Sequence, residues 1–271
     1  MSLPDPRNYR HIVCLTGAGV SAESGLATFR DSNGLWENHR IEDVATPQAF
    51  ERDPHLVWRF YSLRRQAAAR ANPNAAHFAL DRFAATFQGQ FTLVTQNVDG
   101  LHQRACGRGH LETLCMHGTL ARSRCAGCGS VYWDDRAWLD EAGRDGGATN
   151  LLGELEKASM ENLAHYEVKL ADGLPLSPCC QRSLRPHIVW FGEMPLHMPR
   201  IQRELDDCDL FVTIGTSGAV YPAAGFLEQA KRQGATTVCL NLEPLPQTLW
   251  VDHFGQGPAT LLVPSFFSSP A

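Results

Sequence analysis

The sequence lacks any apolar run that approaches the roughly 18–20 residues of a membrane-spanning helix. It also lacks a basic surplus, because 24 Lys and Arg residues are outweighed by 29 Asp and Glu residues, for a net charge of −5. Proteins that bind nucleic acid usually carry such a surplus. The segment Met1–Arg7 lacks the long apolar stretch of a secretory signal. We therefore expect a cytoplasmic protein with neither membrane nor nucleic acid as a partner.

The cysteines do not form the dense, even-numbered set typical of small secreted proteins. Nine of them are spread over 271 residues, which argues against a framework of disulfides. Hydrophobic residues make up 44% of the chain and charged residues 20%. Both values are ordinary for globular proteins and exclude a disordered or collagen-like chain. At about 150 residues per domain, the length suggests two units.

Short apolar runs that end in polar or glycine-rich turns predict β-strands buried on both faces, as in a parallel sheet. Helix-like stretches lie between several of them and favour an α/β fold, a Rossmann-like doubly wound parallel sheet with a smaller inserted lobe. The predicted strands are His11–Thr16, Phe91–Thr95, His187–Phe191, Leu210–Ile214 and Thr236–Leu240, and the helices between them include Ala75–Phe87 and Ala223–Gln233.

Two regions interrupt the alternation of strands and helices. Residues 35–72 give no strand signal and are expected to form a helical insertion. Residues 121–184 hold paired cysteines, a turn at Glu141–Gly147 and a helix-like segment at Leu151–Leu163, and are expected to form a small cysteine-bearing module. The Rossmann-like domain would then consist of residues 1–34, 73–120 and 185–271.

The segments that follow the predicted strands are candidates for a binding site, because ligands of open α/β sheets bind beyond the carboxyl ends of the strands. Residues 17–22, GAGVSA, fit the G-x-G-x-x-A dinucleotide fingerprint, although a tight strand–helix turn would give the same pattern. The later strands lead into QNVDGLH (96–102), GTS (215–217) and NLE (241–243). Such groups suit phosphate, ribose and amide contacts, so together they predict a dinucleotide-binding enzyme.

Four segments then carry a resemblance to a known family. GAGVSAESGLATFR (17–30) resembles the NAD-binding signature of the sirtuins, and QNVDGLH (96–102) resembles their second signature. MHG (116–118) resembles their catalytic histidine motif, and RPHIVWFGE (185–193) their substrate strand. Order and spacing match along nearly the whole chain. The sequence is most similar to bacterial class III sirtuins, which are NAD-dependent protein-lysine deacylases.

The resemblance implies a deacylation that consumes NAD and acts on acyl-lysine proteins. The acyl oxygen attacks C1′ of the nicotinamide ribose, and the products are lysine, nicotinamide and O-acyl-ADP-ribose. His117 corresponds to the family's base, a role that suits a reference pKa of ~6.5. Asn97 and Asp99 would hold the nicotinamide amide and ribose. His77, His102 and His187 are not expected to be catalytic.

The family pattern also implies the other contacts of the two substrates. Phe29 would shield the developing cation from water, and Arg30 would support the cofactor loop. The acyl-lysine peptide would add a strand beside Val189, Trp190, Phe191 and Gly192. The NAD-binding set is Gly17, Ala18, Gly19, Ala22, Phe29, Arg30, Trp36, Gln96, Asn97, Asp99, Gly215, Thr216, Ser217, Asn241, Leu242, Glu243 and Ala259.

Tyr61 and Arg64 are three residues apart and would share a helix face. Viewed in isolation, the pair could be a core aromatic residue beside a solvated arginine. In class III sirtuins a Tyr-x-x-Arg at this place selects succinyl- and malonyl-lysine, because a guanidinium binds a carboxylate through two parallel hydrogen bonds. Ala45 would leave room for the longer acyl chain, and acetyl-lysine should still fit.

The cysteine pairs resemble the structural zinc site of the sirtuins with one departure. Cys125 and Cys128 form a C-x-x-C, whereas Cys179 and Cys180 are adjacent, and the position three before Cys180 is Ser177. Four thiolates would hold Zn²⁺ in a closed tetrahedral site. Either Cys179 replaces the missing ligand, or the module is held without zinc by its own core.

Other functions remain open at this level. An NAD-dependent oxidoreductase would explain the glycine loop alone, and a non-catalytic reader of acyl-lysine is disfavoured by intact Asn97 and His117. Protein ADP-ribosylation is a further alternative. Sirtuins of this type are often monomers, so we expect a monomer or a weak oligomer.

Overall fold

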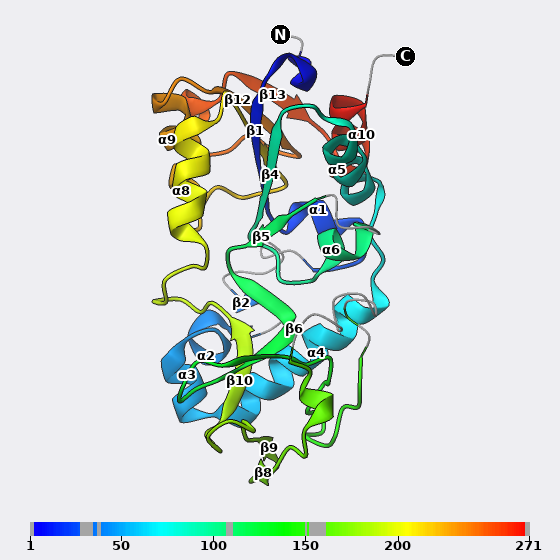
Figure 1. Cartoon of the computed structure of the whole chain (residues 1–271), viewed down its shortest axis with the longest axis vertical. Coiled ribbons are helices and arrows are strands. Elements are labelled where there is room, and N and C mark those ends of the chain that lie inside the picture. The colour runs from blue at the N-terminus through cyan, green and yellow to red at the C-terminus, as the bar shows by residue number, and fades with distance from the viewer. Residues whose placement is uncertain are drawn as a thin grey trace.

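The structure is a computed structural model that describes residues 3–27, 35–36, 39–106, 111–149, 151 and 161–268; for residues 35 and 36 it describes the backbone only. The molecule is elongated, with a sheet flanked by helices at one end and a smaller lobe at the other (Figure 1). Both described ends of the chain lie at the far end of the larger part. No described helix has the length and apolar character needed to cross a membrane.

The described strands fall into four sheets. Their bounds are β1 (His11–Thr16), β2 (Leu35–Trp36), β3 (His39–Arg40), β4 (Gln90–Thr95), β5 (Thr113–Cys115), β6 (Gly118–Cys125), β7 (Val131–Trp133), β8 (Leu170–Ala171), β9 (Leu174–Pro175), β10 (Leu184–Ile188), β11 (Leu210–Ile214), β12 (Thr236–Asn241) and β13 (His253–Gln256).

The α-helices of the described ranges are α1 (Gly19–Ala22), α2 (Ile41–Val44), α3 (Pro47–Arg52), α4 (Pro54–Arg70), α5 (Ala75–Thr86), α6 (Leu101–Ala105), α8 (Met198–Asp207), α9 (Phe226–Arg232) and α10 (Ala259–Phe267). Short 3₁₀ turns are η1 (Pro6–Asn8), η2 (Leu163–His165), η3 (Ala223–Gly225) and η4 (Thr248–Trp250).

The large sheet has six strands in the order β13-β12-β11-β1-β4-β5, and every pair in it is parallel. The central strand β1 pairs with β4 on one side and with β11 on the other. The strand order reverses here, and such a switch point opens a crevice beyond the carboxyl ends of the strands. The predicted Rossmann-like sheet is therefore confirmed.

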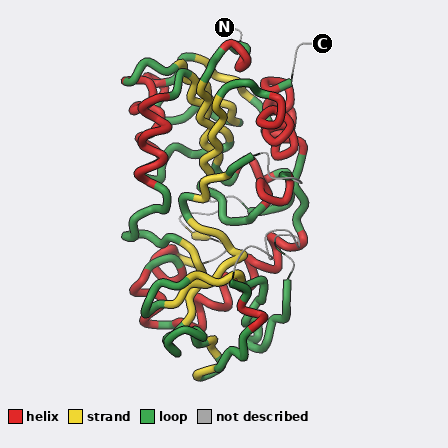
Figure 2. The backbone as a smooth tube through the Cα atoms, viewed as in Figure 1, coloured by secondary structure: helices red, strands yellow, loops and turns green. Residues whose placement is uncertain are grey.

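Helices cover both faces of this sheet, which explains its near-continuous apolar strands (Figure 2). On β1, Ile12 and Cys14 point into a core shared with α5 and α10. Val13 and Leu15 point into the opposite core, shared with α8 and α9. Two cores are thus filled by the alternating side chains of one strand.

The smaller lobe is built around α4 and an antiparallel sheet of order β10-β6-β7. Asp53 caps α4 by accepting a hydrogen bond from Leu56 N at 2.9 Å, and Pro54 occupies the first turn. Arg65 of α4 is fully buried and donates to Asp134 Oδ2 at 3.0 Å and to the Arg122 carbonyl of β6 at 3.0 Å. This ion pair fixes the rotation of α4 against the small sheet.

Some of the predicted elements are wrong or shifted. The run His187–Phe191 is not a strand of the parallel sheet, because β10 ends at Ile188 and pairs antiparallel with β6. Pro186 lacks a backbone N–H and fits the edge position that β10 occupies. Residues 35–72 are largely helical where they are described, but they include the antiparallel pair of short strands β2 and β3. Most of the predicted helix Leu151–Leu163 lies outside the described residues, and Leu163 itself begins η2.

Candidate active site

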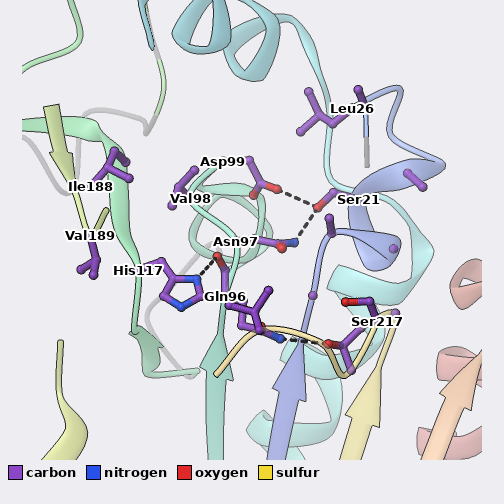
Figure 3. Close-up of a pocket in the computed structure, with 18 of the residues that line it drawn as sticks. Ser21, Leu26, Gln96, Asn97, Val98, Asp99, His117, Ile188, Val189 and Ser217 are labelled. Atoms are coloured by element: carbon purple, nitrogen blue, oxygen red, sulfur yellow. Dashed lines mark hydrogen bonds between the residues drawn. The ribbon is translucent and has the colours of Figure 1, made fainter. Parts of the chain in front are cut away.

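A cleft of about 430 Å³ lies between the carboxyl edge of the large sheet and the smaller lobe. Its walls come from the segments after β1, β4, β11 and β12 on one side, and from α4 and the residues after β10 on the other. Figure 3 shows the side chains of several of these segments around one open space. All of the strand-end motifs identified in the sequence therefore contribute to one site.

The floor of the cleft is formed by two glycine turns that touch. Gly17 N donates to the Ile214 carbonyl at 3.0 Å, and Gly19 N donates to the Gly215 carbonyl at 2.8 Å. A Cβ on Gly19 would lie 2.7 Å from the Gly215 oxygen, and Gly215 has a φ of +59°. Only glycine permits this approach. The result is a surface of bare backbone, which suits close contact with a pyrophosphate.

A group of polar side chains lies beside this floor, where α1 meets the turn after β4. Ser21 Oγ donates to Asp99 Oδ2 at 2.8 Å and accepts from Asn97 Nδ2 at 3.2 Å (Figure 3). Asp99 also accepts from Leu101 N at 2.9 Å. Burial raises the pKa of Asp99 above its usual value, while these hydrogen bonds oppose the shift. Ser21 thus fixes the orientation of both predicted catalytic side chains of this turn.

His117 lies between β5 and β6 and faces the same cleft. Its Nδ1 is 3.1 Å from the Gln96 carbonyl, which can only accept, so Nδ1 carries the hydrogen (Figure 3). Nε2 therefore holds a lone pair. Burial lowers the pKa of His117, so the imidazole is neutral at pH 7. The next residue, Gly118, has a φ of +84° and no side chain, so the backbone can lie close to the His187 carbonyl.

The remaining predicted NAD-binding residues mostly line the cleft. Gln96 Nε2 donates to Thr216 Oγ1 at 3.1 Å, and Asn241 Nδ2 donates to the Thr216 carbonyl at 2.9 Å, so these strand ends are tied together. Phe29 and Arg30 lie outside the described residues, and Trp36 is described only as backbone in β2. Glu243 is exposed and is not among the described lining residues. The others in the lining are Ala18, Ala22, Ser217, Leu242 and Ala259.

Tyr61 and Arg64 both reach the cleft from α4, and Ala45 lies in the same lining. Tyr61 is fully buried, and burial raises the pKa of its phenol, so the hydroxyl keeps its proton at neutral pH. Trp190 Nε1 donates to the Tyr61 hydroxyl at 3.0 Å. Arg65, which follows Arg64 on α4, points away from the cleft and forms an ion pair with Asp134. That ion pair leaves Arg64 on the cleft side of the helix.

The segment after β10 forms the edge of the cleft. Val189 N donates to the His117 carbonyl at 2.9 Å, and Phe191 N donates to the Ala45 carbonyl at 3.0 Å. Val189, Trp190, Phe191 and Gly192 all line the cleft. The predicted substrate strand thus connects His117 to the helical insertion by main-chain hydrogen bonds.

The four predicted zinc ligands lie together in the smaller lobe, near β6. The Sγ atoms of Cys125, Cys128, Cys179 and Cys180 all lie within 4.8 Å of one another. The Cys125–Cys180 distance is 3.3 Å and the Cys128–Cys179 distance is 3.2 Å. Four thiols at this spacing fit a tetrahedral zinc ion with Zn–S bonds of about 2.3 Å. Buried Ser177 stays beside the cluster, where Cys125 Sγ approaches its Oγ to 3.1 Å.

The fold and the cleft define a doubly wound α/β protein with a nucleotide site at the carboxyl edge of its sheet. The model of the Sir2 family matches residues 17–222. An NAD-dependent protein deacylase of Vibrio vulnificus (strain YJ016) is 48% identical over 240 residues, covering 87% of this chain and 83% of the relative. The chain belongs to the Sir2 family.

Solved structures agree with this assignment. An ADP-ribose complex of a mutant Sir2 homologue aligns with a TM-score of 0.78 at 32% identity, covering 96% of this chain and 92% of the other. An NAD complex of a Sir2 homologue aligns with a TM-score of 0.75 at 33% identity, covering 96% and 89%. The family resemblance drawn from the four sequence segments is confirmed.

Sequence reasoning missed several lining residues. Ser21 falls inside the glycine signature, but its link to Asn97 and Asp99 joins segments 76 and 78 residues apart. Tyr221 follows β11 and is 78% exposed at the cleft. A polar residue at an otherwise small-residue turn was the available signal for Ser21, whereas nothing in the sequence marks Tyr221.

Proposed function

We propose that this chain is an NAD-dependent protein-lysine deacylase that prefers succinyl- and malonyl-lysine to acetyl-lysine. The observation that carries the proposal is that Tyr61 and Arg64 line the same cleft as His117 and the glycine turns. The deacylase activity follows from membership of the Sir2 family and from the name of the Vibrio relative. The acid preference is the finer part of the proposal.

The protein's own groups are suited to this reaction. His117 has its Nδ1 hydrogen on the Gln96 carbonyl, which leaves Nε2 to take a proton from a ribose hydroxyl. Asn97 and Asp99, oriented by Ser21, would bind the nicotinamide amide and the ribose. NAD, as co-substrate, supplies the ribose carbon that accepts the acyl oxygen. Gly17, Gly19 and the neighbouring strand ends would hold its phosphates and adenosine.

Acid selectivity would come from the neutral phenol and the cationic guanidinium acting together. The buried phenol of Tyr61 remains a hydrogen-bond donor, because burial raises its pKa. Arg64 offers a planar fork that a carboxylate can accept through two hydrogen bonds. An acetyl group has no such charge, so its binding would depend little on Arg64. The alternative, in which Tyr61 is a core aromatic residue beside a solvated Arg64, is disfavoured because both residues line the cleft.

We also propose that the four-cysteine cluster binds structural zinc, with Cys179 taking the place that Ser177 leaves without a thiol. Three of the cysteines are exposed, and none of the four is among the described residues that line the cleft, so the metal would stabilise the lobe. Metal analysis of protein purified without added zinc tests this. About one zinc per chain is expected, and a ratio near zero would show that the module folds without it.

The decisive experiment is a panel of acyl-lysine peptides incubated with NAD and read by mass spectrometry. We expect free lysine, nicotinamide and an O-acyl-ADP-ribose from succinyl and malonyl peptides, with slower turnover of acetyl peptides. Stable transfer of labelled ADP-ribose to protein would instead favour an ADP-ribosyltransferase. Formation of NADH would favour an oxidoreductase, and the absence of nicotinamide release would favour a reader. The same protein run on a sizing column tests the expected monomer or weak oligomer.

A further inference from the structure

The indole of Trp190 lies between the substrate strand and the proposed acyl pocket. Trp190 is 2% exposed and Tyr61 is fully buried, and the indole Nε1 is 3.0 Å from the phenol oxygen. Main-chain pairing of a peptide with this segment would not require any particular side chain at position 190. The hydrogen bond to Tyr61 therefore points to a second role for the Trp190 side chain, apart from peptide pairing.

The direction of this hydrogen bond is fixed by chemistry. An indole nitrogen donates only, so the Tyr61 oxygen is the acceptor in the contact. The hydrogen of the phenol must then point in a direction other than Trp190. The indole thereby selects the rotamer of the hydroxyl as well as the position of its oxygen.

The indole itself is held by an ion pair. The Arg185 guanidinium carbon lies 3.4 Å from the centre of the Trp190 ring, in cation–π contact. Arg185 makes a two-pronged pair with Glu193 at 2.7 and 2.8 Å, and Glu193 Oε2 also accepts from Trp190 N at 2.8 Å. The ring and the backbone of one residue are therefore clamped by the same pair of charges.

We propose that Trp190 is a positioning residue for acyl selectivity, which sets the Tyr61 hydroxyl so that it can donate to the carboxylate of an acidic acyl group. This inference rests on the proposed preference for succinyl- and malonyl-lysine. It assigns the indole a role in substrate choice that the main chain of the substrate strand does not perform. Trp190 acts through Tyr61 and does not act on the reacting atoms.

The test is a double-mutant cycle of Trp190→Phe and Tyr61→Phe, with succinyl-lysine and acetyl-lysine peptides assayed side by side. Trp190→Phe removes the donor and keeps an aromatic ring. We expect kcat/KM for the succinyl peptide to fall about five- to tenfold, mainly through KM, in line with the loss of one buried hydrogen bond. The acetyl peptide should change less than twofold. In the Tyr61→Phe background, Trp190→Phe should have no further effect.

Trp133→Phe is a matched control, because Trp133 is equally buried and its Nε1 has no hydrogen-bond partner within the described ranges. It should leave the ratio of succinyl to acetyl activity unchanged. Trp190→His retains a ring N–H and should recover part of the loss. If Trp190→Phe does not fold, the cycle is completed with Trp190→His, which should then show a smaller loss that also vanishes without the Tyr61 hydroxyl.

The outcomes separate this inference from the proposed function. A selective loss in Tyr61→Phe, combined with additive effects in the double variant, would overturn the role of Trp190 alone. Equal losses for both peptides in Trp190→Phe would do the same. A wild-type enzyme without desuccinylase activity, or variants of Tyr61 and Arg64 without selective effect, would overturn both.

Discussion

Replacing Arg64 with methionine should remove most of the desuccinylase activity and leave deacetylation nearly intact. Methionine keeps an unbranched side chain of similar length on α4 but has no charge to offer a carboxylate. Losing one partner of a hydrogen-bonded charge pair costs about 2–5 kcal/mol when the pair is buried. Arg64 is half-buried at the cleft, so the lower end, about 2–3 kcal/mol, applies.

At about 1.4 kcal/mol per tenfold, that cost corresponds to a fall of roughly 30- to 150-fold in kcat/KM for succinyl-lysine. The assay is the initial rate of nicotinamide release with matched succinyl and acetyl peptides at saturating NAD. The acetyl rate should remain within about threefold of wild type, and Arg64→Lys should lie between the two, because ammonium lacks the fork. Equal losses for both peptides would refute the reasoning, since Arg64 would then serve the fold or the NAD site.

The neighbouring Arg65 should behave in the opposite way. Arg65→Met leaves Asp134 buried without its cation, so the free energy of unfolding, measured by urea denaturation, should fall by about 3–5 kcal/mol. Any loss of activity should be equal for the succinyl and acetyl peptides. Because burial lowers the pKa of His117, the neutral base persists below pH 6.5, so the acid limb of the kcat/KM profile should lie below that value; a limb above pH 7 would contradict this. Gly19→Ala should lower both the Tm and the affinity for NAD in calorimetry, because its Cβ would lie 2.7 Å from the Gly215 carbonyl oxygen and the two glycine turns would have to separate; an unchanged affinity for NAD would contradict this.

The sheet and its strand ends could be predicted because their signals are local. The strands at His11–Thr16 and Leu210–Ile214 match the predicted runs residue for residue, since each is buried on both faces and bounded by a turn. Strands β5, β6, β7 and β13 were not predicted. Strands β5, β7 and β13 have only three or four residues, too few for a clear pattern, and β6 alternates arginines with small residues that only the lobe explains.

More of the cleft lining than of the lobe's fold could be predicted from the sequence, because glycine, histidine and amide side chains at strand ends have few structural uses. What a sequence cannot supply is the contact between distant segments. Two arginines follow one another on α4, and only the ion pair of Arg65 with Asp134 shows which one turns away from the cleft. The adjacent cysteines were ambiguous for the same reason, until the backbone brought both Sγ atoms to Cys125 and Cys128.

The position of His117 along the chain has a mechanical consequence. The preceding strand, β5, belongs to the large sheet, and the following strand, β6, belongs to the lobe. His117 therefore lies at the junction between the large sheet and the lobe. Its Nδ1 is hydrogen-bonded to the Gln96 carbonyl after β4, and its backbone carbonyl accepts from Val189 N after β10. If His117 is the proton acceptor, as proposed, a peptide that contacts both the large sheet and the lobe would also help to orient its imidazole.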